Sequence, residues 1–145
     1  MRRASALVAL AAAAAFPGCA SAACDPTALA GPSLTQCLAA EEKASSDKVQ
    51  AAYKAAVASI ATRPGVFDAQ RARWRNSLAE SHDLWLRLRN AECQNVAPFE
   101  GQAASTSVVR NRMAAFEAKL ACAIRMNDMR AADLSSRYPP AGPSP

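Results

Sequence analysis

The stretch Ser81–Gln94, with the sequence Ser-His-Asp-Leu-Trp-Leu-Arg-Leu-Arg-Asn-Ala-Glu-Cys-Gln, decides the fold of this chain. Within it Trp85, Arg89 and Cys93 recur every four residues, so on an α-helix they lie along one face. The tryptophan offers a large surface for burial, the arginine a donor group above it, and the cysteine a covalent link at the helix end. No acid, base and nucleophile follow one another in an order typical of catalysis. The stretch therefore predicts a helix that holds other helices in place.

Apolar residues at helical spacing extend this pattern over most of the chain. We expect a first helix over 34–62, a second from 67 or 68 to 93, and a third over 108–134. A short turn joins the first two, and a loop over 94–107 joins the last two. No pattern typical of a β-strand is present. The predicted fold class is all-α, a three-helix up-down-up bundle.

Local signals place the ends of these helices. The tetrapeptide Ser-Leu-Thr-Gln at 33–36 has the form of a capping box that opens the first helix, and Pro64 with Gly65 ends it. One residue of the run Ser105-Thr106-Ser107 is expected to cap the third helix. The predicted inward-facing residues are Leu34, Leu38, Val49, Tyr53, Val57, Ile60, Trp74, Leu78, Trp85, Leu88, Val109, Met113, Phe116, Leu120 and Ile124.

The N-terminus has the layout of a secretory signal peptide. Met1-Arg2-Arg3 precedes an apolar run at 6–16 that is too short to span a bilayer. Ala20-Ser21-Ala22 fits the small-residue rule for signal peptidase, which predicts cleavage before Ala23. The alternative is cleavage before Cys19, which would then carry lipid, although Phe16-Pro17-Gly18 departs from the usual lipoprotein sequence.

Three regions follow from these signals: a signal peptide over 1–22, a helical domain over 23–137, and a Pro-rich extended or disordered tail over 138–145. This organisation predicts a periplasmic or secreted protein. Two of the 17 Lys and Arg residues lie in the signal peptide, which leaves 15 basic and 12 acidic residues, a formal charge of +3. Both signs alternate along the chain, as on solvated helix faces. We therefore predict no nucleic-acid partner and no membrane span.

Four cysteines follow the predicted signal peptide: Cys24, Cys37, Cys93 and Cys122. An even number in an exported chain indicates two disulfides, and the lack of a Cys-x-x-Cys motif argues against a zinc ribbon or a redox pair. Reflecting the second helix onto the first about the turn between them places Cys93 opposite residues 36–37. This geometry favours Cys37–Cys93 with Cys24–Cys122, and the local pairing Cys24–Cys37 with Cys93–Cys122 is the main alternative.

The segment Trp85–Cys93 resembles the signature Trp-x-x-[aromatic]-Arg-Asp-x-x-Cys of the LprI-like lysozyme-inhibitor family, a group of exported bacterial helical domains. Cys24 and Cys37 are similar to the paired N-terminal cysteines of that family, and Val49-Gln50-x-x-Tyr53 is similar to its Leu-Asn-x-x-Tyr. The residues that resemble its closing motif are Cys122, Met126, Asn127, Arg130 and Leu134. The departures are His82 for Gln, Leu88 for the aromatic residue, Asn90 for Asp, Gln50 for Asn and Asn127 for Thr.

The resemblance implies an all-helical, disulfide-linked domain in the periplasm or on the cell surface. It implies structural roles for Tyr53, Trp85, Arg89 and Arg130, no cofactor, and a lysozyme inhibitor in place of an enzyme. His82, the only histidine, fits this view, because consecutive Ser81-His82-Asp83 side chains diverge on a helix and cannot form a triad.

The predicted partner is a protein, lysozyme or another cell-wall hydrolase. A lysozyme cleft works with two carboxyl groups, and an inhibitor needs a protruding loop or helix end to occupy it. The loop over 94–107 is the predicted contact region, since it is polar, contains glycine and is held at one end by Cys93. The residues expected to contact the partner are Gln94, Phe99, Glu100 and Gln102. Because common lysozymes are basic, a chain of charge +3 gains no long-range electrostatic steering.

Sulfur residues of the third helix suggest an alternative function. Met113, Cys122, Met126 and Met129 are soft ligands that suit copper(I), which favours a periplasmic metal or small-ligand binding module. Methionines at helical spacing are also typical of core packing, and on this ground no metal site is predicted.

Overall fold

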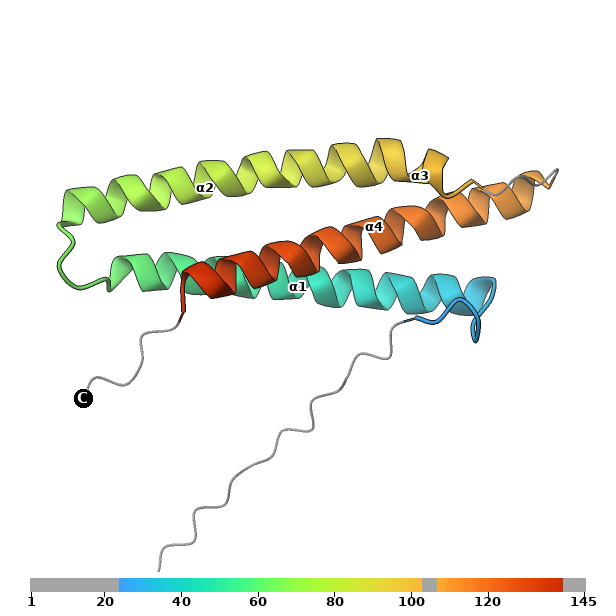
Figure 1. Cartoon of the computed structure of the whole chain (residues 1–145), viewed down its shortest axis with the longest axis horizontal. Helices are drawn as coiled ribbons and strands as arrows, with labels where there is room; N and C mark the ends of the chain where they lie inside the picture. Colours follow the sequence, from blue (N-terminus) through green and yellow to red (C-terminus); the bar gives the residue numbers. More distant parts are fainter. Residues whose placement is uncertain (1–23, 103–106, 140–145) are drawn as a thin grey trace, which may run out of the picture.

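The computed structural model describes residues 24–102 and 107–139, and these form three long antiparallel rods in the predicted up-down-up order (Figure 1). The predicted signal peptide, Cys19 and the tail beyond Pro139 lie outside the described residues. None of the helices within the described ranges is both long and apolar enough to cross a membrane. The elements are α1 (Pro32–Ala61), α2 (Asp68–Asn90), a π-helix η1 (Ala91–Val96), α3 (Ala97–Glu100) and α4 (Val108–Arg137).

The first helix begins differently from the prediction. The capping box at 33–36 is wrong: the N-cap is Gly31, which has φ of 58° and no side chain to cap with, and Pro32 fills the first helical turn. Proline suits this position because its missing N–H would be unsatisfied there in any case. The Thr35 hydroxyl instead lies 3.2 Å from the Gly31 carbonyl oxygen and 3.1 Å from Glu117 Oε1 of α4. The start of α1 is thereby connected to α4.

The turn between α1 and α2 follows the prediction. Gly65 has φ of 73°, in the left-handed region that glycine adopts readily. Arg71 Nη1 donates a hydrogen bond of 3.1 Å to the Arg63 carbonyl oxygen, and the same arginine pairs with Asp68 in the first turn of α2.

At the other end of the molecule Ser107 caps α4, as predicted, by accepting a hydrogen bond from the Arg110 N–H.

The loop predicted over 94–107 is wrong for its first half, because the second rod continues through η1 and α3 as far as Glu100. Pro98 does not stop it, since it lies in the first turn of α3, where its missing N–H costs no helical hydrogen bond. The rod ends at Gly101, whose N–H donates to the Ala97 carbonyl oxygen at 3.0 Å. A Cβ on Gly101 would lie 2.2 Å from Ala118 Cβ, so only glycine lets this end approach α4 so closely.

Two apolar clusters lie toward opposite ends of the bundle. The cluster near the α1–α2 turn joins all three rods and contains Ala56, Ile60, Leu78, Leu134 and Tyr138. Tyr138, which was expected to begin the tail, is buried, and its hydroxyl accepts a hydrogen bond of 3.2 Å from Trp74 Nε1. The second cluster joins η1 and α3 to α4 and contains Cys93, Ala97, Cys122, Ala123 and Met126.

Several residues predicted to face inward are exposed. Leu88 on α2 is 53% exposed and Val109 on α4 is 69% exposed, and Phe116 is also exposed. α1 packs along α4 for most of its length, whereas α2 contacts α1 and is joined to α4 mainly through η1 and α3. Because α2 has a small contact surface with its neighbours, its buried stripe is narrower than the sequence pattern predicts.

The disulfides have the local pairing, Cys24–Cys37 and Cys93–Cys122, so the favoured long-range pairing is wrong. Cys24–Cys37 holds the segment that precedes α1 against that helix. Cys93–Cys122 holds η1 against the middle of α4. The favoured pairing assumed that Cys93 faces α1, whereas η1 packs on α4.

Candidate partner-binding site

A stack of aromatic rings occupies the middle of the bundle, between the two apolar clusters. The ring of His82 lies between Tyr53 of α1, at a centroid distance of 4.3 Å, and Trp85 of α2, at 5.7 Å. His82 is buried, and its Nδ1 has no hydrogen-bond partner among the described residues. The stack joins α1 to α2 where few other contacts connect them.

Two arginines cover the tryptophan of this stack. The guanidinium carbon of Arg89 lies 5.5 Å from the centre of the Trp85 ring, and that of Arg130, from α4, lies 5.8 Å from it. Both distances are in the range of cation–π contacts. The four residues predicted to be structural from the family motif, Tyr53, Trp85, Arg89 and Arg130, therefore lie together around His82.

A buried amide extends this group toward α1. Asn127 of α4 is fully buried, its Oδ1 accepts a hydrogen bond of 3.1 Å from Arg89 Nη1, and its Nδ2 donates one of 3.0 Å to Ser45 Oγ. Ser45 lies in the polar stretch of α1 at 41–46 and is buried. The sequence did not predict the burial of this serine, because nothing in the sequence of α1 shows that an amide on another helix donates a hydrogen bond to it.

Burial and the charges around His82 disfavour the protonated form of its imidazole. Burial is the first cause that lowers the pKa of its imidazole, and the positive charge of Arg130 is the second. Asp83 acts in the opposite direction, and Arg89 lowers the pKa further. A buried neutral ring between two aromatic planes has no access to a substrate, so the group at the centre of the bundle holds the helices together.

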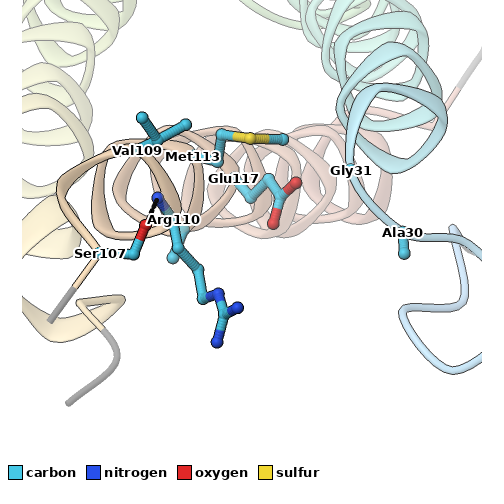
Figure 2. A pocket seen from close by; sticks show the side chains of 8 residues that line it. Ala30, Gly31, Ser107, Val109, Arg110, Met113 and Glu117 are labelled. Atoms are coloured by element: carbon cyan, nitrogen blue, oxygen red, sulfur yellow. Dashed lines mark hydrogen bonds between the residues drawn. The ribbon is translucent and has the colours of Figure 1, made fainter. Parts of the chain in front are cut away.

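The end of the molecule that carries α3 and the start of α4 has exposed apolar side chains and an open hollow. Figure 1 shows that the first turns of α4 extend beyond the ends of α1 and α3. An open hollow of about 490 Å³ lies there between α4 and the segment before α1 (Figure 2). Its lining residues are Ala30, Gly31, Ser107, Val109, Arg110, Met113, Ala114 and Glu117.

The predicted contact residues belong to the same end. Gln94 lies in η1, Phe99 and Glu100 in α3, and Gln102 directly after it, and all four side chains are exposed. Phe99 is 74% exposed. The structure thus presents these residues at the end of the second rod in place of a loop, and the exposed Val108 and Val109 lie in the first turn of α4, which extends past this end.

The sulfur atoms do not form the soft-metal site of the alternative hypothesis. Cys122 is part of a disulfide, and Met113 and Met129 are separated along α4 by about 24 Å at the helical rise of 1.5 Å per residue. Met126 Sδ lies 3.5 Å from Cys93 Sγ as part of the second apolar cluster. Among the described residues, Cys24, Cys37 and Glu41 have ligand atoms within 4.8 Å of one another, but both sulfurs belong to a disulfide. Neither the sulfur residues of α4 nor the group of Cys24, Cys37 and Glu41 therefore offers a thiolate ligand to a metal ion.

A comparison with protein-family models gives a match to the model described as Lysozyme inhibitor LprI over residues 24–134. The chain belongs to the LprI family. Searches among curated proteins and among solved structures gave no match. LprI is a family of inhibitors, and the two disulfides together with this membership indicate an exported protein with a protein partner such as lysozyme.

The LprI match covers both disulfides and the whole aromatic and arginine group. It ends at Leu134, before the buried Tyr138. The family motif therefore marks the residues that build the scaffold. The sequence did not predict the hollow beside Arg110, because Val109 and Met113 were assigned to the core. The run Val108-Val109-Arg110, with an arginine directly after two valines at the start of a helix, was the signal that could have found it.

Proposed function

We propose that this LprI-family protein inhibits lysozyme by placing the end of its bundle, formed by α3 and the first turns of α4, in the substrate cleft. The observation that carries the proposal is the family match over residues 24–134. The end of the bundle supports it as the contact region, because exposed apolar side chains are gathered there, among them Phe99, Val108 and Val109. Exposed aromatic and apolar groups of this kind are typical of protein-binding surfaces.

The scaffold suits a rigid inhibitor. One disulfide fixes the segment before α1, and the other fixes η1 to α4, so both brace the half of the bundle that carries this end. A contact surface that is ordered before binding loses little conformational entropy on association. Short-range contacts must supply the affinity, since a weakly basic chain is not steered toward a basic enzyme.

The test is the lysis of a bacterial cell-wall suspension by lysozyme, followed by the decrease in turbidity with increasing amounts of the exported protein. Inhibition that saturates at one inhibitor per enzyme is the expected result. With a soluble chitooligosaccharide as substrate, a cleft block raises KM and leaves kcat unchanged. Unchanged lysis at a large molar excess of the protein would exclude the function.

A pair of matched variants tests the contact region. Phe99→Ser removes an exposed ring from α3, and Leu88→Ser makes a comparable change on α2, where the side chain is 53% exposed. Loss of a central aromatic contact typically weakens binding by about 1–3 kcal/mol, or roughly five- to 150-fold. We expect that loss for the first variant and a change below threefold for the second. Equal effects would show that inhibition does not depend on the α3 end.

A further inference from the structure

Arg110 is the basic residue among those that line the hollow. It lies in the first turn of α4 and is exposed, and no acidic residue in the described part of the chain pairs with it. In Figure 2 its guanidinium extends away from α4, in the space between Ser107 and Ala30. Glu117, the carboxylate of the same hollow, is directed elsewhere and lies 3.1 Å from the Thr35 hydroxyl.

The walls beside Arg110 are fixed in place. Ala30 and Gly31 belong to the segment that the Cys24–Cys37 disulfide ties to α1. Thr35 connects this wall to α4, and the Ser107 cap fixes the first turn of α4, from which Arg110 extends. The arginine therefore stands on a rigid base, next to an apolar surface that includes the exposed Val109.

The target of an LprI protein offers a matching charge at short range. Glycosidases of the lysozyme type have two carboxyl groups about 5–5.5 Å apart in a substrate cleft. A guanidinium can donate two parallel hydrogen bonds to such a carboxylate, and it keeps its charge in a site that excludes water. This pairing operates inside the cleft, so it does not require that the two proteins attract each other at long range.

We infer that the face of α4 beside the hollow is the surface that enters the cleft of a cell-wall glycosidase, and that Arg110 pairs with a catalytic carboxylate while Val109 packs on the apolar wall of a sugar subsite. This inference rests on the proposed function, and it adds which group of the enzyme the inhibitor recognises. The inhibitor then occupies the two positions that the substrate needs, a sugar subsite and a catalytic carboxyl group. The hollow beside Arg110 receives the rim of the enzyme cleft.

The experiment measures the dissociation constant for lysozyme by calorimetry at physiological salt with the full exported chain, either wild type or carrying Arg110→Ala, Arg110→Lys or Arg125→Ala. Arg125 is the matched control, because it is exposed on the same helix and lies about 22 Å along it from Arg110 at the rise of 1.5 Å per residue. Removing one partner of a buried charge pair weakens binding about thirtyfold or more. We expect that loss for Arg110→Ala, a smaller loss for Arg110→Lys, and a change below threefold for Arg125→Ala.

A second arm identifies the atom that Arg110 recognises. Two lysozyme variants are used, each with one of the two catalytic carboxyl groups replaced by its amide. One of them should bind the wild-type inhibitor more weakly and should bind Arg110→Ala no more weakly than unmodified lysozyme does. This non-additivity is the signature of direct pairing. If Arg110→Ala loses the same affinity for unmodified lysozyme and for both variants, Arg110 contacts another part of lysozyme and the inference is wrong.

The two proposals fail in different ways. A wild-type protein that does not inhibit lysozyme overturns both. A wild-type protein that inhibits, and an Arg110→Ala variant that inhibits equally well, leaves the proposed function standing and overturns the inference alone. Circular dichroism and thermal unfolding of each variant verify that a loss of binding is not a loss of fold.

Discussion

Mild acid should destabilise this protein through its single histidine. The His82 ring is stacked between Tyr53 of α1 and Trp85 of α2, and the charged groups around it are Arg130 of α4 with Arg89 and Asp83 of α2. Burial and the two arginines lower the pKa of the imidazole, and Asp83 offsets only part of this effect. Protonation of the folded state therefore places a third positive charge beside two others.

The direction and the limit of the effect follow from linkage. The unfolded chain binds the proton near the ordinary pKa of 6.5, and the folded chain binds it only at lower pH. Stability is thus complete above about pH 6.5 and falls as the pH drops below it, because the unfolded state holds more protons there. Between about pH 7.5 and 5.5 the free energy of unfolding falls by up to about 1.4 kcal/mol, a limit reached if folded His82 stays neutral throughout.

Urea unfolding followed by circular dichroism at pH 7.5, 6.5 and 5.5 measures this loss above the range in which most carboxylates titrate. The variant His82→Gln removes the titrating ring and keeps a polar side chain at this position. We expect the wild-type midpoint to fall with pH at constant slope m and the variant midpoint to stay level. An equal fall in both proteins would refute the reasoning, because another group would then bind the proton.

Two further substitutions test the scaffold at positions where the structure gives a definite partner. Asn127→Ala removes the hydrogen bonds of the buried amide to Ser45 and Arg89. Because the Arg89 donor is charged, the free energy of unfolding measured in urea should fall by about 2–4 kcal/mol. Gly101→Ala places a Cβ 2.2 Å from Ala118 Cβ, so the end of α3 must move away from α4. Such overpacking should cost about 1–3 kcal/mol and should increase amide hydrogen exchange in α3 before the rest of the chain.

Each of these substitutions has a control in the same chain. Asp128→Ala removes an exposed carboxylate whose ion pair with Lys48 is open to solvent, and a change below about 0.5 kcal/mol is expected. Gly65→Ala adds a methyl group at a position where nothing lies within 4 Å of it, so its cost of about 1 kcal/mol comes from φ of 73° alone and should leave α3 exchange unchanged. Stability losses that match between each substitution and its control would contradict the contacts described for Asn127 and Gly101.

The three rods could be predicted from sequence because helical periodicity and the Pro64-Gly65 turn are local signals. The continuation through Pro98 could not, since a proline that ends one helix and one that begins the next look alike in sequence. The disulfide pairing failed for a related reason. Sequence spacing gives the height of Cys93 along a rod, but the direction in which it points depends on whether η1 packs on α1 or on α4.

The candidate site was predicted only in part, for a physical reason. Phe99 and its neighbours were identified as the contact region because they follow the anchor at Cys93, and the structure places them at an exposed end. Arg110 and the hollow were not found, because a helix of thirty residues predicts one continuous buried face. The first turns of α4 extend past α1 and α3, and their apolar side chains Val108 and Val109 are exposed.

This arrangement separates what keeps the protein folded from what it binds. The residues that resemble the family motif, Tyr53, Trp85, Arg89 and Arg130, are packed around the buried His82 in the middle of the bundle. The exposed end lies beyond both disulfides, so substitutions there change a surface without removing a core contact. For this reason stability and inhibition should respond to different variants: Asn127→Ala should lower the unfolding midpoint with little change in affinity at a temperature where the protein stays folded, and Arg110→Ala should do the reverse.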